Sequence, residues 1–105
     1  MTLPDFVEVA RLEDLPLGKG TTVTVDGKDI AIYNVDGHVY AIDDSCLHQG
    51  SSLGWSPLEG KVVTCRGHGM RYDVTTGKVV GSSDRGVATY PVRVEDGKIL
   101  VAIGS

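Results

Sequence analysis

Two short loops hold four of the five cysteine and histidine residues in this 105-residue chain. The first reads SCLHQG and contains Cys46 and His48; the second reads TCRGHGM and contains Cys65 and His68. Because their ligands are two or three positions apart on glycine-containing loops, each pair can turn toward one small object. Thiolates and imidazoles bind zinc and iron, so the pattern predicts a metal centre built from two separate loops.

Each loop is mixed, with one cysteine and one histidine. A single zinc ion would accept this set in a tetrahedron, and a disulfide between Cys46 and Cys65 is the other alternative. Zinc modules more often group cysteine with cysteine and histidine with histidine. A histidine within three positions of each cysteine fits a metal site in a reducing compartment better than it fits a disulfide. In a centre of two metals each loop would give one ligand to each metal, so the mixing favours a binuclear centre.

The elements that must position these loops read as β-strands. Asp-Gly occurs at 26–27, 36–37 and 96–97, each time between short runs rich in Val, Ile, Thr and Tyr. Asp-Gly suits the positive φ angles of tight hairpin turns, so three antiparallel hairpins are predicted. Only residues 9–15 could form a helical turn or so, since no longer stretch has a helical period.

The predicted fold is therefore all-β, a small antiparallel sandwich. Residues 1–105 form a single domain, with a metal-binding subdomain inserted at approximately 44–86, where glycine, serine and the four ligands concentrate. Near the C-terminus, Tyr90, Val92 and Val94 alternate with other residues and are predicted on one half-buried face. Pro91 lacks an amide donor and is predicted at a strand start or a sheet edge.

Charge and hydropathy exclude several function classes. The net charge is −4 and basic residues do not cluster, which counts against binding to nucleic acid or to anionic membranes. No apolar run is long enough to span a bilayer and no secretory signal begins the chain, so a cytoplasmic protein is expected.

The acidic pairs 43–44 and 95–96 are predicted to be solvated surface, with steering of a protein partner as the alternative. His38, with no cysteine nearby, is predicted on an exposed turn.

Taken in order, these motifs resemble those of Rieske-type [2Fe–2S] proteins: Cys46-Leu47-His48-Gln49-Gly50, Leu58-Glu59-Gly60, Cys65-Arg66-Gly67-His68-Gly69, Tyr72-Asp73 and Thr76-Gly77. The resemblance implies one [2Fe–2S] cluster per chain. It also implies that Cys46 and Cys65 bind one iron while His48 and His68 bind the other, the arrangement in which two histidines replace two cysteines.

The same resemblance places Gln49, Gly50, Gly67, Met70 and Tyr72 around the cluster. High-potential relatives have two further cysteines that tie the loops with a disulfide, and a serine two residues after the last histidine. This chain has no further cysteine, and Met70, which cannot donate a hydrogen bond, stands at the serine position. Tyr72 matches the tyrosine that bonds a cysteine sulfur. We therefore expect a low potential within the range of roughly −150 to +300 mV for such centres.

Among Rieske proteins the chain resembles the free-standing ferredoxins of bacterial multicomponent oxygenases. The resemblance implies a monomeric one-electron carrier without a catalytic site of its own. It would take electrons from a flavin-dependent NAD(P)H reductase, a flavoprotein, and pass them to a terminal oxygenase. Two alternatives stay open: the Rieske-like small subunit of an assimilatory nitrite reductase, and a binding module stapled by zinc.

Overall fold

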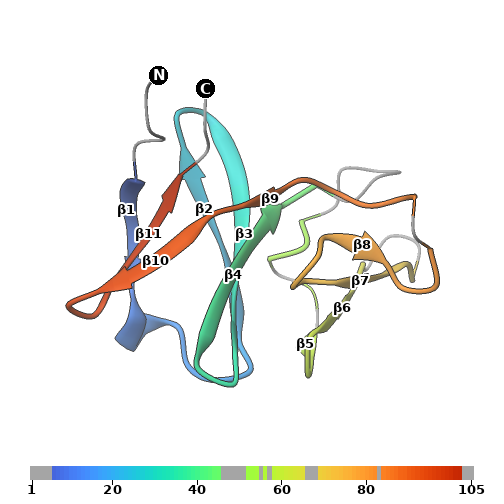
Figure 1. The fold of residues 1–105 in the computed structure, drawn as a ribbon, viewed down its shortest axis with the longest axis horizontal. Coiled ribbons are helices and arrows are strands. Elements are labelled where there is room, and N and C mark those ends of the chain that lie inside the picture. The colour runs from blue at the N-terminus through green and yellow to red at the C-terminus, as the bar shows by residue number, and fades with distance from the viewer. Residues whose placement is uncertain are drawn as a thin grey trace.

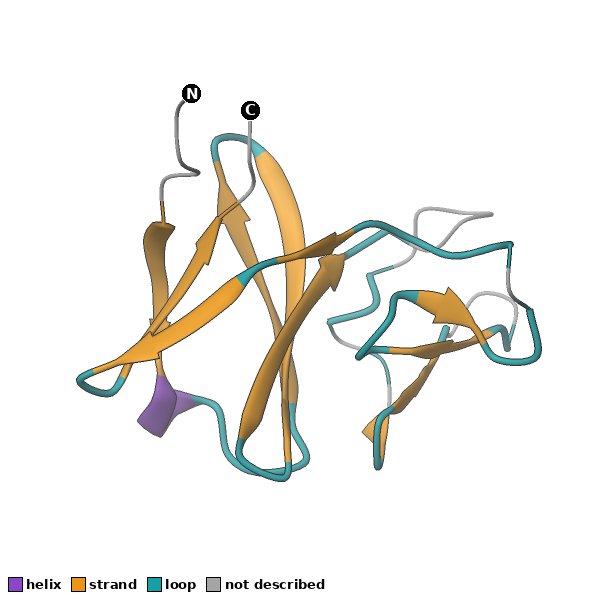
Figure 2. Ribbon diagram, in the orientation of Figure 1, coloured by secondary structure: helices purple, strands orange, loops and turns teal. Residues whose placement is uncertain are grey.

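The computed structural model describes residues 6–45, 52–54, 56, 58–65, 69–82 and 84–102. These ranges are built almost entirely from antiparallel β-strands, as the sequence predicted (Figures 1 and 2). Their single helical element is the 3-10 turn η1, Leu12–Asp14. None of their helices is long or apolar enough to cross a membrane.

The strands are arranged in three sheets, ordered β1-β11-β10, β2-β3-β4-β9 and β5-β6-β7-β8. The first sheet consists of β1 (Phe6–Arg11), β10 (Val92–Glu95) and β11 (Lys98–Ala102). The second consists of β2 (Gly20–Val25), β3 (Lys28–Val35), β4 (His38–Asp43) and β9 (Thr89–Tyr90). The third consists of β5 (Leu58–Glu59), β6 (Val62–Thr64), β7 (Arg71–Asp73) and β8 (Lys78–Val79).

All three Asp-Gly pairs form the predicted hairpin turns. They connect β2 to β3, β3 to β4 and β10 to β11. The aspartates have φ between 51° and 52°, and the glycines that follow have φ between 74° and 91°. Two consecutive residues with positive φ match the right-handed twist of the flanking strands, which explains why a two-residue loop suffices at each turn.

The first and second sheets pack face to face around one group of buried side chains, which we call the sandwich core. It contains Leu15, Val25, Ile30, Ile32, Ala41, Ile99 and Val101. The third sheet lies to one side of this sandwich in Figure 1. Between the third sheet and the second sheet is a separate group, the site-side core, which contains Ala31, Tyr33, Ile42, Leu53, Val63, Cys65, Tyr72 and Val74.

The N-terminal segment differs from its prediction. Residues 9–11 belong to strand β1, and only Leu12–Asp14 form a helical turn. The reason is a long-range contact, because β1 pairs with β11 at the other end of the chain. That pairing overrides the weak local preference on which the prediction for 9–15 rested.

At Pro91 the chain passes from the second sheet, through β9, to the first sheet, through β10. Pro91 immediately precedes β10, in agreement with its missing amide donor. Tyr90 and Val92 are half-buried as predicted, but the prediction for Val94 is wrong, since that side chain is exposed. Strand β10 is an edge strand: its neighbour in the sheet is β11, and no strand pairs with its other edge.

Candidate metal centre at the ends of two loops

The second predicted ligand loop begins where β6 ends and finishes where β7 begins. The amide of Cys65 donates a hydrogen bond to the carbonyl of Met70 at 2.7 Å, and the amide of Gly69 donates to the carbonyl of Cys65 at 2.9 Å. Gly69 has a φ of 72°, a conformation that glycine adopts without steric cost. These two bonds close the base of the loop and hold the Cys65 backbone in place.

The first predicted ligand loop is closed at its base in a similar way. Ser45 and Ser52 form an antiparallel bridge, and the amide of Leu53 donates to the carbonyl of Asp44 at 2.6 Å. The described residues on either side of this loop are therefore held together at the end of β4.

A single buried core connects the two loop bases. Leu53, which follows the first loop, and Cys65, which begins the second, both belong to the site-side core. The Tyr33 hydroxyl on β3 donates a buried hydrogen bond of 2.7 Å to the carbonyl of Leu53. The fold thus brings the described bases of the two loops, at Leu53 and Cys65, onto the same face of the second sheet.

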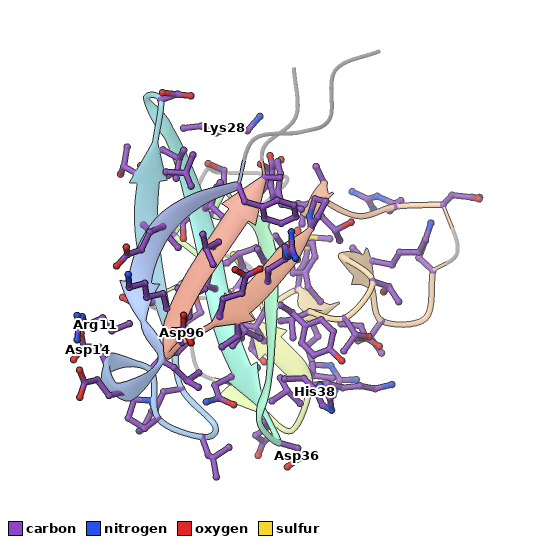
Figure 3. All side chains as sticks on the ribbon, turned by 60° about the vertical axis from the view of Figure 1, so that its left-hand side comes forward. Arg11, Asp14, Lys28, Asp36, His38 and Asp96 are labelled. Carbon is purple, nitrogen blue, oxygen red and sulfur yellow. The ribbon has the colours of Figure 1, made fainter. Side chains whose placement is uncertain are left out.

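Three of the predicted site residues lie within the described ranges. Cys65 is a free thiol with 1% of its surface exposed, Tyr72 is fully buried, and Met70 is half-buried against the site-side core. The other predicted residues lie outside the described ranges: Cys46, His48, Gln49, Gly50, Gly67 and His68. His38 is exposed at the β3–β4 turn next to Asp36, as predicted (Figure 3).

The prediction that Asp43 and Asp44 are solvated surface is wrong. Asp44 is 5% exposed, and its Oδ1 accepts hydrogen bonds from the Thr22 hydroxyl at 2.8 Å, the Ser52 hydroxyl at 2.9 Å and the Gly54 amide at 2.8 Å. Asp43 is half-buried and accepts a hydrogen bond from the Tyr90 hydroxyl. Sequence reasoning missed Asp44 because its donors come from β2 and from the far side of the loop, neither of which is near it in the sequence.

The position of Asp44 affects the neighbouring tyrosine. Burial raises the pKa of Tyr33 far above its ordinary value, and the negative charge of Asp44 raises this pKa further. Tyr33 therefore stays protonated and continues to donate to Leu53. The base of the first loop is fixed to the second sheet by these two neighbouring groups.

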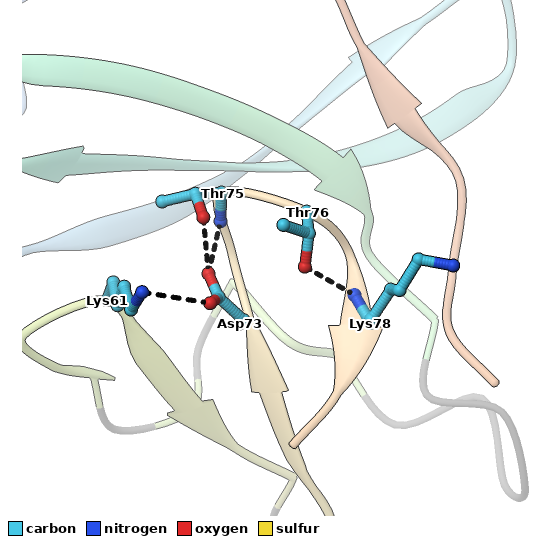
Figure 4. Close-up of polar contacts among 5 residues, drawn as sticks. All are labelled: Lys61, Asp73, Thr75, Thr76 and Lys78. Carbon is cyan, nitrogen blue, oxygen red and sulfur yellow. Dashed lines mark hydrogen bonds and ion pairs between the residues drawn. The ribbon is translucent and has the colours of Figure 1, made fainter. Parts of the chain in front are cut away.

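Asp73, singled out by the sequence motif, organises the turn between β7 and β8 (Figure 4). Its Oδ1 accepts from the Thr75 amide at 2.9 Å and the Thr75 hydroxyl at 2.6 Å, and its Oδ2 lies 3.3 Å from the Lys61 Nζ. Desolvation raises the pKa of Asp73, but the Thr75 hydrogen bonds and the Lys61 charge outweigh it, so the pKa is lowered overall. The carboxylate form is therefore the one that this turn stabilises.

An Asp73→Asn variant should lose stability in a pH-dependent manner. Because the folded-state pKa is lowered, the stabilisation from Asp73 is fully present above the unfolded value of about 3.9 and is lost progressively as the pH falls through the lower, folded-state pKa. The difference in unfolding free energy between the two proteins, measured by urea denaturation, should thus be largest at pH 7 and shrink as the pH is lowered below about 4. Lys61→Gln should give a smaller difference in the same pH window, whereas a difference that does not change with pH would contradict the prediction.

Gly77, the other end of this turn, has no room for a side chain. Its φ is 78°, and a Cβ would overlap the carbonyl oxygen of Val87 and lie 2.8 Å from Cγ2 of Thr89. Gly77→Ala should therefore lower the unfolding free energy by about 3 kcal/mol, combining left-handed strain with overpacking. The matched control is Gly97→Ala, where φ is 74° but nothing lies within 4 Å, so strain alone should cost about 1 kcal/mol. Equal losses in urea denaturation would show that the Val87 contact is unimportant.

The described part of the centre fits an iron–sulfur cluster. Cys65 offers a buried sulfur that is free of a disulfide, on a loop whose backbone is closed at both ends. Cysteine thiolates are the ligands that iron–sulfur clusters require, and burial among apolar side chains limits access of water to such a centre. Cys65, the one predicted ligand among the described residues, therefore agrees with the cofactor that the sequence implied.

Comparison with known proteins gives the same result. The family model described as the Rieske [2Fe–2S] domain matches residues 5–91. The chain belongs to this family, whose cofactor is a [2Fe–2S] cluster.

The chain is 36% identical over 98 residues to the ferredoxin component of the naphthalene 1,2-dioxygenase/salicylate 5-hydroxylase systems of Ralstonia sp., covering 92% of this chain and 94% of the relative. Its structure is similar to the ferredoxin of carbazole 1,9a-dioxygenase from Nocardioides aromaticivorans IC177, with a TM-score of 0.84, 32% identity and coverage of 92% and 96%. Because these relatives match from end to end, the chain is a ferredoxin-type electron-transfer protein without a catalytic site of its own.

Two further solved structures bear on its partners. A chain from a complex of reduced oxygenase and oxidised ferredoxin in carbazole 1,9a-dioxygenase matches with a TM-score of 0.84 and 30% identity, covering 92% of each chain. A protein described as a small subunit of nitrite reductase matches with a TM-score of 0.78, covering 92% of this chain and 97% of the other. Its identity is 20%, so that likeness concerns the fold alone.

Proposed function

We propose that this protein carries single electrons from a flavin-dependent NAD(P)H reductase to a terminal oxygenase in a multicomponent system. The observation that carries the proposal is the pair of closed loop bases, at 44–53 and 65–70, that meet at one buried core containing Cys65. The relative that was crystallised with its oxygenase supports an oxygenase as the acceptor. The reductase follows from the resemblance to oxygenase ferredoxins.

In this proposal Cys46 and Cys65 hold one iron of the cluster, and His48 and His68 hold the other. When bound, the cluster supplies reversible one-electron chemistry. The protein holds the two loops in register, and its apolar core limits the access of water to the sulfur side of the centre. Residues 44–86 form the cluster-binding part of a single domain, 1–105.

The second part of the proposal is a low reduction potential. Hydrogen bonds to the sulfurs stabilise the reduced, more negative state and raise the potential. Met70 lies beside the site-side core with a thioether that cannot donate, and the chain has no cysteines beyond Cys46 and Cys65 for a disulfide between the loops. Gln49, Gly50, Gly67 and Tyr72 complete the proposed surroundings, and the resemblance gives Tyr72 the role of donor to a cysteine sulfur.

The setting that we propose is a monomer in the cytoplasm that binds neither nucleic acid nor membranes. The net charge of −4 and the lack of clustered basic residues in the sequence support the absence of nucleic-acid binding. The reducing compartment agrees with two cysteines that serve as ligands.

The experiment that tests the function combines spectroscopy with reconstitution. Protein from iron-replete cells should be brown, contain two iron and two sulfide per chain, and give the EPR signal of a histidine-ligated [2Fe–2S] centre on reduction. It should then support NAD(P)H-dependent turnover when mixed with a reductase and a terminal oxygenase of this class. A colourless protein that contains zinc would refute the cluster. Co-purification with a nitrite reductase large subunit, without transfer to an oxygenase, would favour the nitrite reductase alternative.

A further inference from the structure

We infer that the buried carboxylate of Asp44 is a positioning residue for the first ligand loop whose negative charge also lowers the reduction potential of the cluster. The inference rests on the cluster ligation proposed above. It adds a second determinant of potential, independent of Met70 and of the missing disulfide.

Geometry places Asp44 at the base of the loop that carries two proposed ligands. It is two residues before Cys46 in the sequence. Its backbone carbonyl accepts a hydrogen bond from the Leu53 amide at 2.6 Å. Its Oδ1 accepts from the Ser52 hydroxyl and the Gly54 amide, which follow the loop in the sequence. One residue thus closes the loop through both its main chain and its side chain.

Hydrogen bonding holds this carboxylate but does not neutralise it. Three donors converge on Oδ1, which is the environment that stabilises a carboxylate. The ion pairs among the described residues are Arg11–Glu13, Lys61–Asp73 and Arg93–Glu95, none of which involves Asp44. With 5% of its surface exposed, Asp44 is also poorly screened by solvent.

The hydrogen bonds that close the loop need an oxygen acceptor at Asp44, but they do not need its negative charge. An asparagine has the same shape, and its amide oxygen could accept the same three hydrogen bonds. One-electron reduction would add a unit of negative charge to a centre whose proposed ligand Cys46 is two residues from Asp44, and like charges repel more strongly in a buried site than in water. A fixed carboxylate here therefore favours the oxidised state, and the local charge around a cluster is a known determinant of its potential.

The test is Asp44→Asn, compared with the wild-type protein in voltammetry at fixed pH and ionic strength. The variant should keep its iron and its EPR signal, while its midpoint potential shifts upward. Hydrogen exchange should show that the Gly54 amide is still protected, since the amide oxygen replaces Oδ1. The matched control is Asp96→Asn at the β10–β11 turn, which removes the same charge from an exposed site and should leave the potential unchanged (Figure 3).

A potential of Asp44→Asn that is lower than that of the wild type, or no higher than that of Asp96→Asn, would overturn the inference. If Asp44→Asn fails to hold the cluster, Thr22→Val is the second variant. It removes one donor from Oδ1, which leaves more of the negative charge uncompensated, so the potential should fall. An unchanged or raised potential would overturn the inference in that case. A wild-type protein without a cluster would instead refute the proposed function itself.

Discussion

Replacing Cys65 by serine is expected to yield a colourless protein that retains essentially no iron. Serine is close in size to cysteine, so the buried position in the site-side core is preserved while the thiolate is lost. The folded protein should also unfold at lower temperature than the wild type, because a cluster that binds only the folded state stabilises it. Iron and sulfide analysis, visible absorption and far-UV circular dichroism measure these effects.

The matched control is His38→Ala, since His38 is the one histidine outside the two loops and is exposed. This variant should keep the full iron content and the colour of the wild type. Cys46→Ser, His48→Ala and His68→Ala should behave like Cys65→Ser, because each removes one of four proposed ligands. Normal iron content in all four ligand variants would contradict the assignment of the centre.

Replacing Gly54 by alanine is expected to lower the unfolding free energy by about 3 kcal/mol or more. A Cβ at this position would lie 2.7 Å from the Thr21 carbonyl carbon and would also overlap the Thr22 hydroxyl that binds Asp44. The backbone of β2 cannot move away without breaking its pairing with β3. The variant should also lose its cluster faster than the wild type, because Gly54 and Asp44 together close the first loop.

Urea denaturation of Gly54→Ala and of the control variant Gly60→Ala distinguishes the cost of steric overlap from the cost of backbone strain. Gly60 has a φ of 61° and nothing within 4 Å, so its variant should lose about 1 kcal/mol from strain alone and keep its cluster. If the two variants were equally stable, the close approach of Gly54 to β2 would not be a determinant of the fold.

Much of the β framework could be predicted because its signals are local. Each Asp-Gly pair requires a conformation that these two residues adopt readily, and the flanking alternation shows which residues form strands. The prediction of the ligand loops rests on a similarly local signal, since four residues of rare type lie within short segments. Of these four residues the structure describes Cys65, so the ligand set stays a prediction.

The features that could not be predicted depend on contacts between distant parts of the chain. Residues 9–11 became a strand because β1 pairs with β11, and the exposure of Val94 departs from the face that the local alternation predicted. In the sequence Asp44 looks like a surface aspartate. Its donors Thr22 and Gly54 lie next to it in the fold because β2 packs against the base of the first loop. No periodicity or local motif encodes such an arrangement.

The two faces of strand β3 pack against different cores. This limits which segments of the chain could be transferred to another protein without losing the site. Ile30 and Ile32 belong to the sandwich core, whereas Ala31 and Tyr33 belong to the site-side core. Recombination that transplanted residues 44–86 into another protein would leave Ala31, Tyr33 and Ile42 behind, and with them one wall of the chamber in which Cys65 is buried. The second sheet and the bases of the loops therefore form one structural unit, which residues 44–86 alone would not reproduce.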